Sequence, residues 1–231
     1  MTSLGFAGQP AGLPAAQPTP YIPAITSDVV VDLSHWQAPV DFEKAKSAGI
    51  AAVLLKATQG STWTDVTFAQ RFAAATASGL LVGAYHFLDN SPPELQVENF
   101  LSAAEGCPVL ALDAESNAIG GTVTVPQAAE AAARLNMATG SLPLIYISRY
   151  GPDQRGTGLP NGVLSRCPLW LPAYNSRPVC PPGWSEWALW QHTDGTVGPD
   201  PVPVAGIGRC DRSRFSGTVA DLAAWWKSPR L

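Results

Sequence analysis

The sequence predicts a single α/β domain built as an irregular barrel, and three observations support this prediction. From Asp28 onward, short apolar runs alternate with Ala-rich amphipathic stretches, the pattern of repeated strand–helix units around a largely parallel sheet. The 231 residues are 46% hydrophobic, which is enough to bury a large core. After Ser148 the pattern loosens into Gly- and Pro-rich segments. We therefore expect about five βα units and a less regular closing third.

The first half of the chain alternates strictly between the two kinds of element. Strands are predicted over residues 29–34, 51–57, 81–87 and 109–115, and the helices that follow them over 42–47, 66–78, 93–104 and 126–139. Gly49, Gly79 and Gly140 stand where a helix C-cap favours glycine, and Pro126 occupies a first helical position.

The second half keeps the strands and loses most helices. Strands are predicted over residues 144–148, 169–174, 188–192 and 208–212, and one helix over 219–227. Residues 1–27 contain no Lys, Arg, Asp or Glu and are rich in Pro and Ala. We therefore expect a flexible tail over 1–27 and a barrel domain over 28–231.

Charge and composition exclude several partners and cofactors. A formal net charge of -4 without a long basic run argues against nucleic acid and anionic membrane surfaces. The tail lacks the basic start and apolar stretch of a secretory signal, and no window approaches the ~20 apolar residues of a membrane span. We expect a protein made in a host cytoplasm, with neither metal nor cofactor, because its cysteines and histidines lack zinc-site spacing.

The cysteines leave two alternatives open. Cys167 and Cys180 flank a short Pro-rich stretch that a disulfide would close, and free buried thiols are equally compatible with the spacing of these residues, Cys107 and Cys210.

Four predicted strands end in polar side chains, which in a parallel barrel meet at one face. Asp32, Lys56 and Tyr85 end the first three, and Asp113 and Glu115 end the fourth on one side of the strand. A single acid there is more often a helix cap, but three acids from two strands are hard to explain as caps. Burial and mutual repulsion raise the pKa of such acids, as a proton donor requires. The pattern favours glycosidic bond hydrolysis.

Other chemistries have weaker support. Calcium binding by Asp32, Asp113 and Glu115 stays open, although their spacing is not that of an EF-hand. The sequence contains neither a P-loop nor a GxSxG elbow for phosphoryl or acyl transfer.

Eight short motifs follow one another along the chain. They are Val-Asp-Leu-Ser-His-Trp-Gln (31–37), Leu-Lys-Ala-Thr-Gln-Gly (55–60), Gly-Ala-Tyr-His-Phe (83–87), Leu-Asp-Ala-Glu (112–115), Tyr-Ile-Ser (146–148), Leu-Trp-Leu-Pro-Ala-Tyr (169–174), Leu-Trp-Gln (189–191) and Cys-Asp-Arg-Ser-Arg-Phe (210–215). Their order resembles that of glycoside hydrolase family 25 lysozymes. The resemblance implies a (β/α)5β3 barrel that cleaves the β-1,4 bond between N-acetylmuramic acid and N-acetylglucosamine in bacterial peptidoglycan. We also expect a monomer that is a phage lysin, either an endolysin or a virion-associated enzyme, because the acid set is intact and the sequence shows no secretory signal.

The resemblance further implies a role for each matching residue. Glu115 would be the general acid/base, and Asp113 would orient the substrate's 2-acetamido group for attack on the anomeric carbon. Asp32 would act as nucleophile, electrostatic support or substrate ligand. The implied substrate-binding residues are Asp211, Tyr85, Tyr146, Lys56, Trp170 and Trp190, the two tryptophans as sugar-stacking platforms; a buried core role fits the two tyrosines equally well.

Some residues point away from catalysis, and two other functions stay open. We expect His35, His86 and His192 to be structural and Trp226 to be a packing residue. Gln59 stands where many relatives have Glu. The alternatives are a non-catalytic glycan-binding barrel, which would not need a proton donor, and another retaining N-acetylhexosaminidase such as a chitinase.

Overall fold

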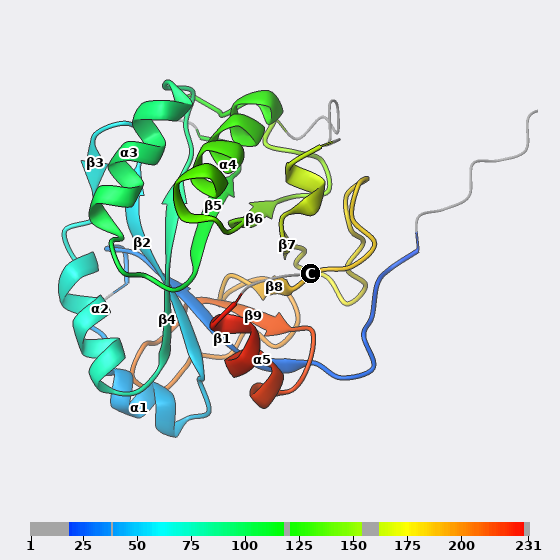
Figure 1. The fold of residues 1–231 in the computed structure, drawn as a ribbon. Coiled ribbons are helices and arrows are strands. Elements are labelled where there is room, and N and C mark those ends of the chain that lie inside the picture. Colours follow the sequence, from blue (N-terminus) through cyan, green and yellow to red (C-terminus); the bar gives the residue numbers. More distant parts are fainter. Residues whose placement is uncertain (1–18, 38, 118–120, 154–161, 229–231) are drawn as a thin grey trace, which may run out of the picture.

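The structure is a computed structural model, and it describes residues 19–37, 39–117, 121–153 and 162–228 (Figure 1). Eight strands close into a barrel, because β1 pairs with β2 on one side and with β9 on the other. The strands are β1 (Ser27–Leu33), β2 (Ala52–Gln59), β4 (Leu81–Phe87), β5 (Leu110–Ala114), β6 (Leu144–Ile147), β7 (Leu169–Pro172), β8 (Leu189–Thr193) and β9 (Asp211–Phe215), and β3 (Trp63–Thr64) extends β2. This confirms the predicted barrel.

The first four helices of the chain cover one side of the barrel, and the last one lies apart from them next to β1 and β9, as Figure 1 shows. The helices are α1 (Phe42–Ser47), α2 (Phe68–Ala77), α3 (Pro93–Ala103), α4 (Val125–Thr139) and α5 (Val219–Trp226), with a 3-10 turn, η1 (Leu164–Arg166). All five helices were predicted, and α4 ends at Gly140 with a φ of 73°. In the part of the chain that the structure describes, no helix is both long and apolar enough to cross a membrane.

The last strand lies further along the chain than predicted. It was expected over residues 208–212, but β9 begins at Asp211 and runs antiparallel to both β1 and β8. Residues 204–208 instead form a turn closed by a bridge between Val204 and Gly208, with positive φ at Gly206 and Gly208. The turn reverses the chain, so the sheet is parallel only from β1 to β8.

The lower half of the barrel interior is an apolar core. Val30 and Leu54 belong to a buried cluster that includes Trp226 from α5. Trp226 Nε1 donates a hydrogen bond to Val82 O at 3.0 Å. A Cβ on Gly83 would lie 2.7 Å from Leu54 Cδ2 and 3.1 Å from Trp226 Cζ2, so only glycine leaves room for the indole. Trp226 is thus a packing residue, as predicted.

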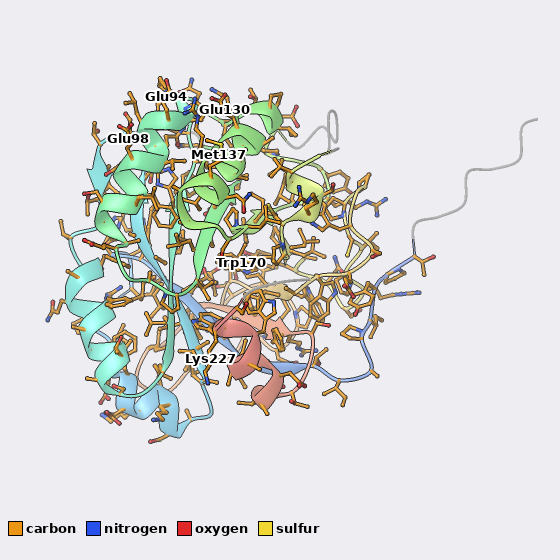
Figure 2. All side chains as sticks on the ribbon, viewed as in Figure 1. Glu94, Glu98, Glu130, Met137, Trp170 and Lys227 are labelled. Atoms are coloured by element: carbon orange, nitrogen blue, oxygen red, sulfur yellow. The ribbon has the colours of Figure 1, made fainter. Side chains whose placement is uncertain are left out.

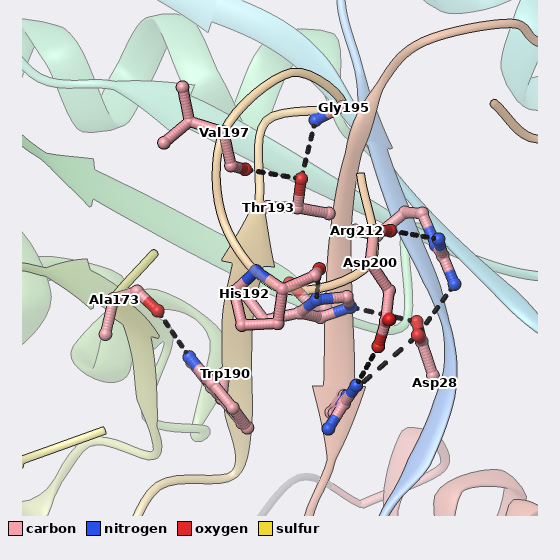
Figure 3. Close-up of polar contacts among 12 residues, drawn as sticks. Asp28, Ala173, Trp190, His192, Thr193, Gly195, Val197, Asp200 and Arg212 are labelled. Carbon is pink, nitrogen blue, oxygen red and sulfur yellow. Dashed lines mark hydrogen bonds and ion pairs between the residues drawn. The ribbon is translucent and has the colours of Figure 1, made fainter. Parts of the chain in front are cut away.

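The helix-free third of the barrel is held on its outside by charged groups (Figure 3). Arg212 Nη2 donates to Asp28 Oδ2 at 2.6 Å, and His192 Nε2 lies 3.1 Å from Asp28 Oδ1. Arg214 Nη2 donates to Asp200 Oδ2 at 2.9 Å, which ties the loop after β8 to β9. This ion-pair network joins β1, β8 and β9 on the side of the barrel away from α1 to α4. His192 is structural, as predicted.

Part of the predicted tail packs on this same side. Trp187 Nε1 donates to Tyr21 O at 3.0 Å, and the two rings meet edge to face at 5.8 Å. Tyr21 N also donates to Pro178 O at 3.1 Å. Residues 21–27 therefore contact the barrel, while residues 1–18 lie outside the described part of the chain. All four cysteines are free thiols, so the structure holds no disulfide between Cys167 and Cys180.

Candidate active site

A cavity of about 240 Å³ opens at the carboxyl ends of the strands. It is lined by Asp32, Ser34, Trp36, Lys56, Tyr85, Phe87, Asp113, Glu115, Tyr146, Trp170, Tyr174, Gln191 and Asp211. Every predicted site residue except Trp190 is in this set.

The strand register explains how distant residues meet there. Asp113 on β5 pairs with Tyr146 on β6, and Asp32 on β1 lies directly opposite Asp211 on antiparallel β9. Glu115 follows the end of β5. Asp32 and Asp113 lie two residues beyond the buried apolar Val30 and Ala111 on their strands, so alternation brings both acids inward at the open end. Asp211 reaches the same end as the first residue of β9, because this strand runs in the opposite direction.

Burial makes the four acids difficult to ionise together. It raises the pKa of Asp211 to about 6, and with the charge of Asp211 it raises the pKa of Asp32 well above its usual value. For Asp113, burial and then the charge of Glu115 raise the pKa, and Lys56 opposes them. Burial and the charge of Asp211 also raise the pKa of Glu115. The cluster therefore retains protons toward neutral pH, as a proton-donating site needs.

Asp113 offers an acceptor that the protein does not use. Its side chain is buried, and its Oδ1 receives no hydrogen bond from the described residues. Buried carboxylate oxygens normally have partners, because an unpaired one loses its hydration without compensation. Asp113 is thus suited to accept an N–H from a bound ligand.

Gln191 organises the opposite wall of the cavity and was not among the site residues predicted from the sequence. Its Oε1 accepts hydrogen bonds from the hydroxyls of Tyr146 at 2.8 Å and Tyr174 at 2.9 Å. These contacts orient the amide so that Nε2 donates to Asp32 Oδ2 at 3.0 Å. The bond favours the ionised form of Asp32 and opposes the rise in its pKa. Side-chain alternation along β8 is the sequence feature that indicates this role, because Gln191 faces the barrel interior if its neighbour Trp190 faces outward.

The two predicted stacking tryptophans lie on opposite sides of the barrel wall. Trp170 lies inside the ring of strands (Figure 2), but it is only 2% exposed and meets Tyr146 edge to face at 4.8 Å, so it forms the floor of the cavity. Trp190 points out of the barrel, where Nε1 donates to Ala173 O at 2.7 Å and Arg214 lies over the ring. The prediction that Trp190 stacks on sugar in this cavity was wrong, because neighbouring residues on a strand face opposite sides.

Lys56 is the cation beside the acids. Its Nζ donates to Gln59 Oε1 at 2.7 Å and lies 4.6 Å from the centre of the Phe87 ring. Burial lowers its pKa, against the charges of Asp113 and Glu115. Among the described residues, no group of three or more His, Cys, Asp or Glu could hold a metal ion.

The buried side chain of His86 points from β4 out of the barrel, toward α3. Its ring contacts Thr58 Oγ1 at 2.7 Å and Gln96 Oε1 at 3.1 Å, and burial lowers its pKa to about 4. It is a neutral structural residue, as predicted.

Comparison with known proteins identifies the family. The model of the family "Glycosyl hydrolases family 25" matches residues 31–200. Lysozyme M1 from Streptomyces globisporus is 32% identical over 222 residues, covering 87% of this chain and 72% of that protein. An N,O-diacetylmuramidase from Arthroderma benhamiae is 29% identical over 180 residues, covering 71% and 75%. The family GH25 lysozyme structure from Aspergillus fumigatus superposes with a TM-score of 0.74 at 30% identity, covering 88% of this chain and 100% of that one. The chain belongs to glycosyl hydrolases family 25 and is a glycoside hydrolase.

Proposed function

We propose that this enzyme is a peptidoglycan muramidase that cleaves the β-1,4 bond between N-acetylmuramic acid and N-acetylglucosamine, with Glu115 as general acid/base and Asp113 as the residue that handles the acetamido group. One observation carries the assignment of roles. Glu115 is half-buried at the mouth of the cavity, whereas Asp113 is buried below it with an unused acceptor oxygen. The outer acid can reach a glycosidic oxygen, and the inner one can hold an N–H.

The proposed first step breaks the glycosidic bond. Glu115 gives its proton to the leaving oxygen while the carbonyl oxygen of the 2-acetamido group bonds to the anomeric carbon. Asp113 accepts the acetamido N–H, which orients the group and balances the positive charge that develops on it. Asp32 and Asp211, paired across β1 and β9, provide electrostatic support for the anomeric centre.

The proposed second step restores the enzyme. Water attacks the anomeric carbon, the bond to the acetamido oxygen breaks, and the Glu115 carboxylate takes the proton of the water. Two displacements at one carbon give net retention. The raised pKa of Glu115 supports both roles, because the group must hold a proton in one step and release it in the other.

Identification of the new reducing end tests this function. The purified chain is incubated with peptidoglycan, the products are reduced with borohydride, and the muropeptides are analysed by mass spectrometry. We expect reduced N-acetylmuramic acid. Reduced N-acetylglucosamine, or release from chitin in preference to peptidoglycan, would instead indicate another N-acetylhexosaminidase, and binding without any new reducing end would indicate a glycan-binding barrel.

The biological setting is also part of the proposal. We propose that the chain acts on the bacterial cell wall as a monomer, delivered as a phage endolysin or a virion component. Membership of a family that includes lysozymes supports the cell wall as the site of action. Light scattering of the purified chain tests the monomer. The division into a tail over 1–27 and a barrel over 28–231 stays a prediction, which removal of residues 1–18 and separately of 1–27 would test.

A further inference from the structure

Lys56 is held beside the catalytic cavity by neutral groups. Its Nζ donates a hydrogen bond to Gln59 Oε1 at 2.7 Å. The same atom lies 4.6 Å from the centre of the Phe87 ring and 5.2 Å from the centre of the Trp63 ring. In the part of the chain that the structure describes, the ammonium forms no ion pair with a carboxylate. One amide oxygen and two aromatic faces therefore fix this cation without cancelling its charge.

The charge of Lys56 acts on the acids of the cavity. Among the described residues that line the cavity, Lys56 is the only cation. The titratable groups that interact electrostatically with Glu115 are Asp32 on β1, Lys56 on β2, Asp113 on β5, Tyr146 on β6 and Asp211 on β9. The three aspartates favour the protonated form of Glu115, whereas Lys56 favours its carboxylate. The balance therefore depends on how much of the Lys56 charge is left uncancelled.

Asp65 lies outside the cavity, and its charge also acts on Lys56. Other donors hold this carboxylate. His35 N donates to it at 2.9 Å, and His35 Nδ1 lies 3.0 Å from its Oδ2. Thr67 Oγ1 donates to its Oδ1 at 2.7 Å. The hydrogen-bond acceptor of the ammonium is therefore Gln59, and a glutamate at this position would have nearly the same shape with one negative charge.

We propose that Gln59 is a positioning residue that holds the Lys56 ammonium toward the acids with its charge uncancelled, and so sets the upper pH limit for proton donation by Glu115. The inference rests on the proposed function, because it concerns the acid assigned there. A carboxylate at position 59 would pair with the ammonium and add a negative charge to the site. Both changes would favour the protonated form of Glu115. The neutral amide therefore places the working range of the acid at lower pH than a glutamate would.

The first test compares kcat/KM for soluble peptidoglycan fragments as a function of pH in the wild type, Gln59→Glu and Gln59→Leu. The basic limb of this profile reports the acid of the free enzyme. In Gln59→Glu this limb should move to higher pH by about 0.5–1 pH unit. Gln59→Leu removes the acceptor without adding charge, so the ammonium can turn toward solvent, and the limb should move the same way by a smaller amount. Gln70→Glu, the same change on the exposed face of α2, is the control and should move the limb by less than about 0.2 pH unit.

A second measurement separates this inference from the proposed function. The chain contains seven glutamates, so labelling their carboxyl carbons with ¹³C gives few NMR resonances, and the resonance of Glu115 is identified by its loss in Glu115→Gln. Its titration midpoint should be higher in Gln59→Glu than in the wild type by about 0.5–1 pH unit. This result would support the role of Gln59 even in a chain that cleaves no peptidoglycan, an outcome that would overturn only the muramidase. Equal midpoints in the wild type and both Gln59 variants, or a lower midpoint in Gln59→Leu, would overturn the role of Gln59.

Discussion

The two ends of the barrel interior lie on the same strands and have opposite chemistry. Val30 and Leu54 pack in the apolar lower layer, and two residues further along their strands Asp32 and Lys56 line the catalytic cavity. The lower layer is closed by Trp226 and contributes the hydrophobic stabilisation of the barrel. The upper layer places acids where burial opposes their ionisation.

We infer that interior residues only two positions apart on the same strand serve different purposes: the lower ones stabilise the barrel and the upper ones take part in catalysis. Substitutions in the lower layer should then change the free energy of unfolding with little effect on the chemistry of folded molecules. Substitutions in the upper layer should change the rate, and removal of a charge there should leave the fold intact or stabilise it. The following predictions test that separation.

The largest effect is expected for Glu115→Gln. The amide cannot donate and retake the proton, so kcat should fall by about 10²- to 10⁴-fold while the melting temperature stays the same or rises. Release of reducing ends and thermal unfolding measure the two quantities. Glu105→Gln, at an exposed position before β5, should change neither. Unchanged activity in Glu115→Gln would remove the proposed acid.

Trp226→Ala should have the converse effect. Loss of the buried indole and of its bond to Val82 O should lower the free energy of unfolding by about 3–5 kcal/mol. Urea denaturation measures this change. Below the unfolding transition, the rate per folded molecule should match that of the wild type. A folded variant without activity would show that the lower layer positions the catalytic groups after all.

Asp211→Asn should change the pH dependence of stability. The pKa of Asp211 is about 6 in the folded chain against an ordinary 3.8, so the folded state binds this proton more tightly than the unfolded state does. The free energy of unfolding should therefore fall as pH rises between these values, by up to about 3 kcal/mol. The variant should lose this slope and be more stable than the wild type at pH 7, as measured by denaturation from pH 4 to 7. An unchanged slope would mean that Asp211 is not a major source of it.

Gln191→Leu should give the smallest change. Without the Nε2 donor, the pKa of Asp32 should rise further, because its ionised form loses a hydrogen bond. The acidic limb of the kcat/KM profile should move to higher pH, and kcat/KM near neutrality should fall by about tenfold. Gln70→Leu, on the exposed face of α2, is the control. A uniform loss at all pH values would indicate a packing role for Gln191 instead.

The sequence predicted most strands and helices and the strand ends where polar groups meet. Hydrophobic periodicity is a local property, so it is readable without the fold. It placed Asp113 and Glu115 on one side of their strand, and both line the cavity. Hydrophobic periodicity did not predict that the chain turns back at residues 204–208. This turn depends on the backbone conformation of its glycines and on a bridge between two residues outside the strands.

The sequence by itself determined the order of the elements and the identity of the acids at the strand ends. Only the tertiary structure decided which face of each strand turns inward. Side-chain alternation predicts that Trp190 and Gln191 point in opposite directions. The pairing of β1 with β9, which closes the barrel, places Gln191 beside Asp32 and leaves Trp190 on the outside. The same closure brings Asp211 opposite Asp32. Contacts of this kind depend on the register between strands far apart in the chain, which no local pattern encodes.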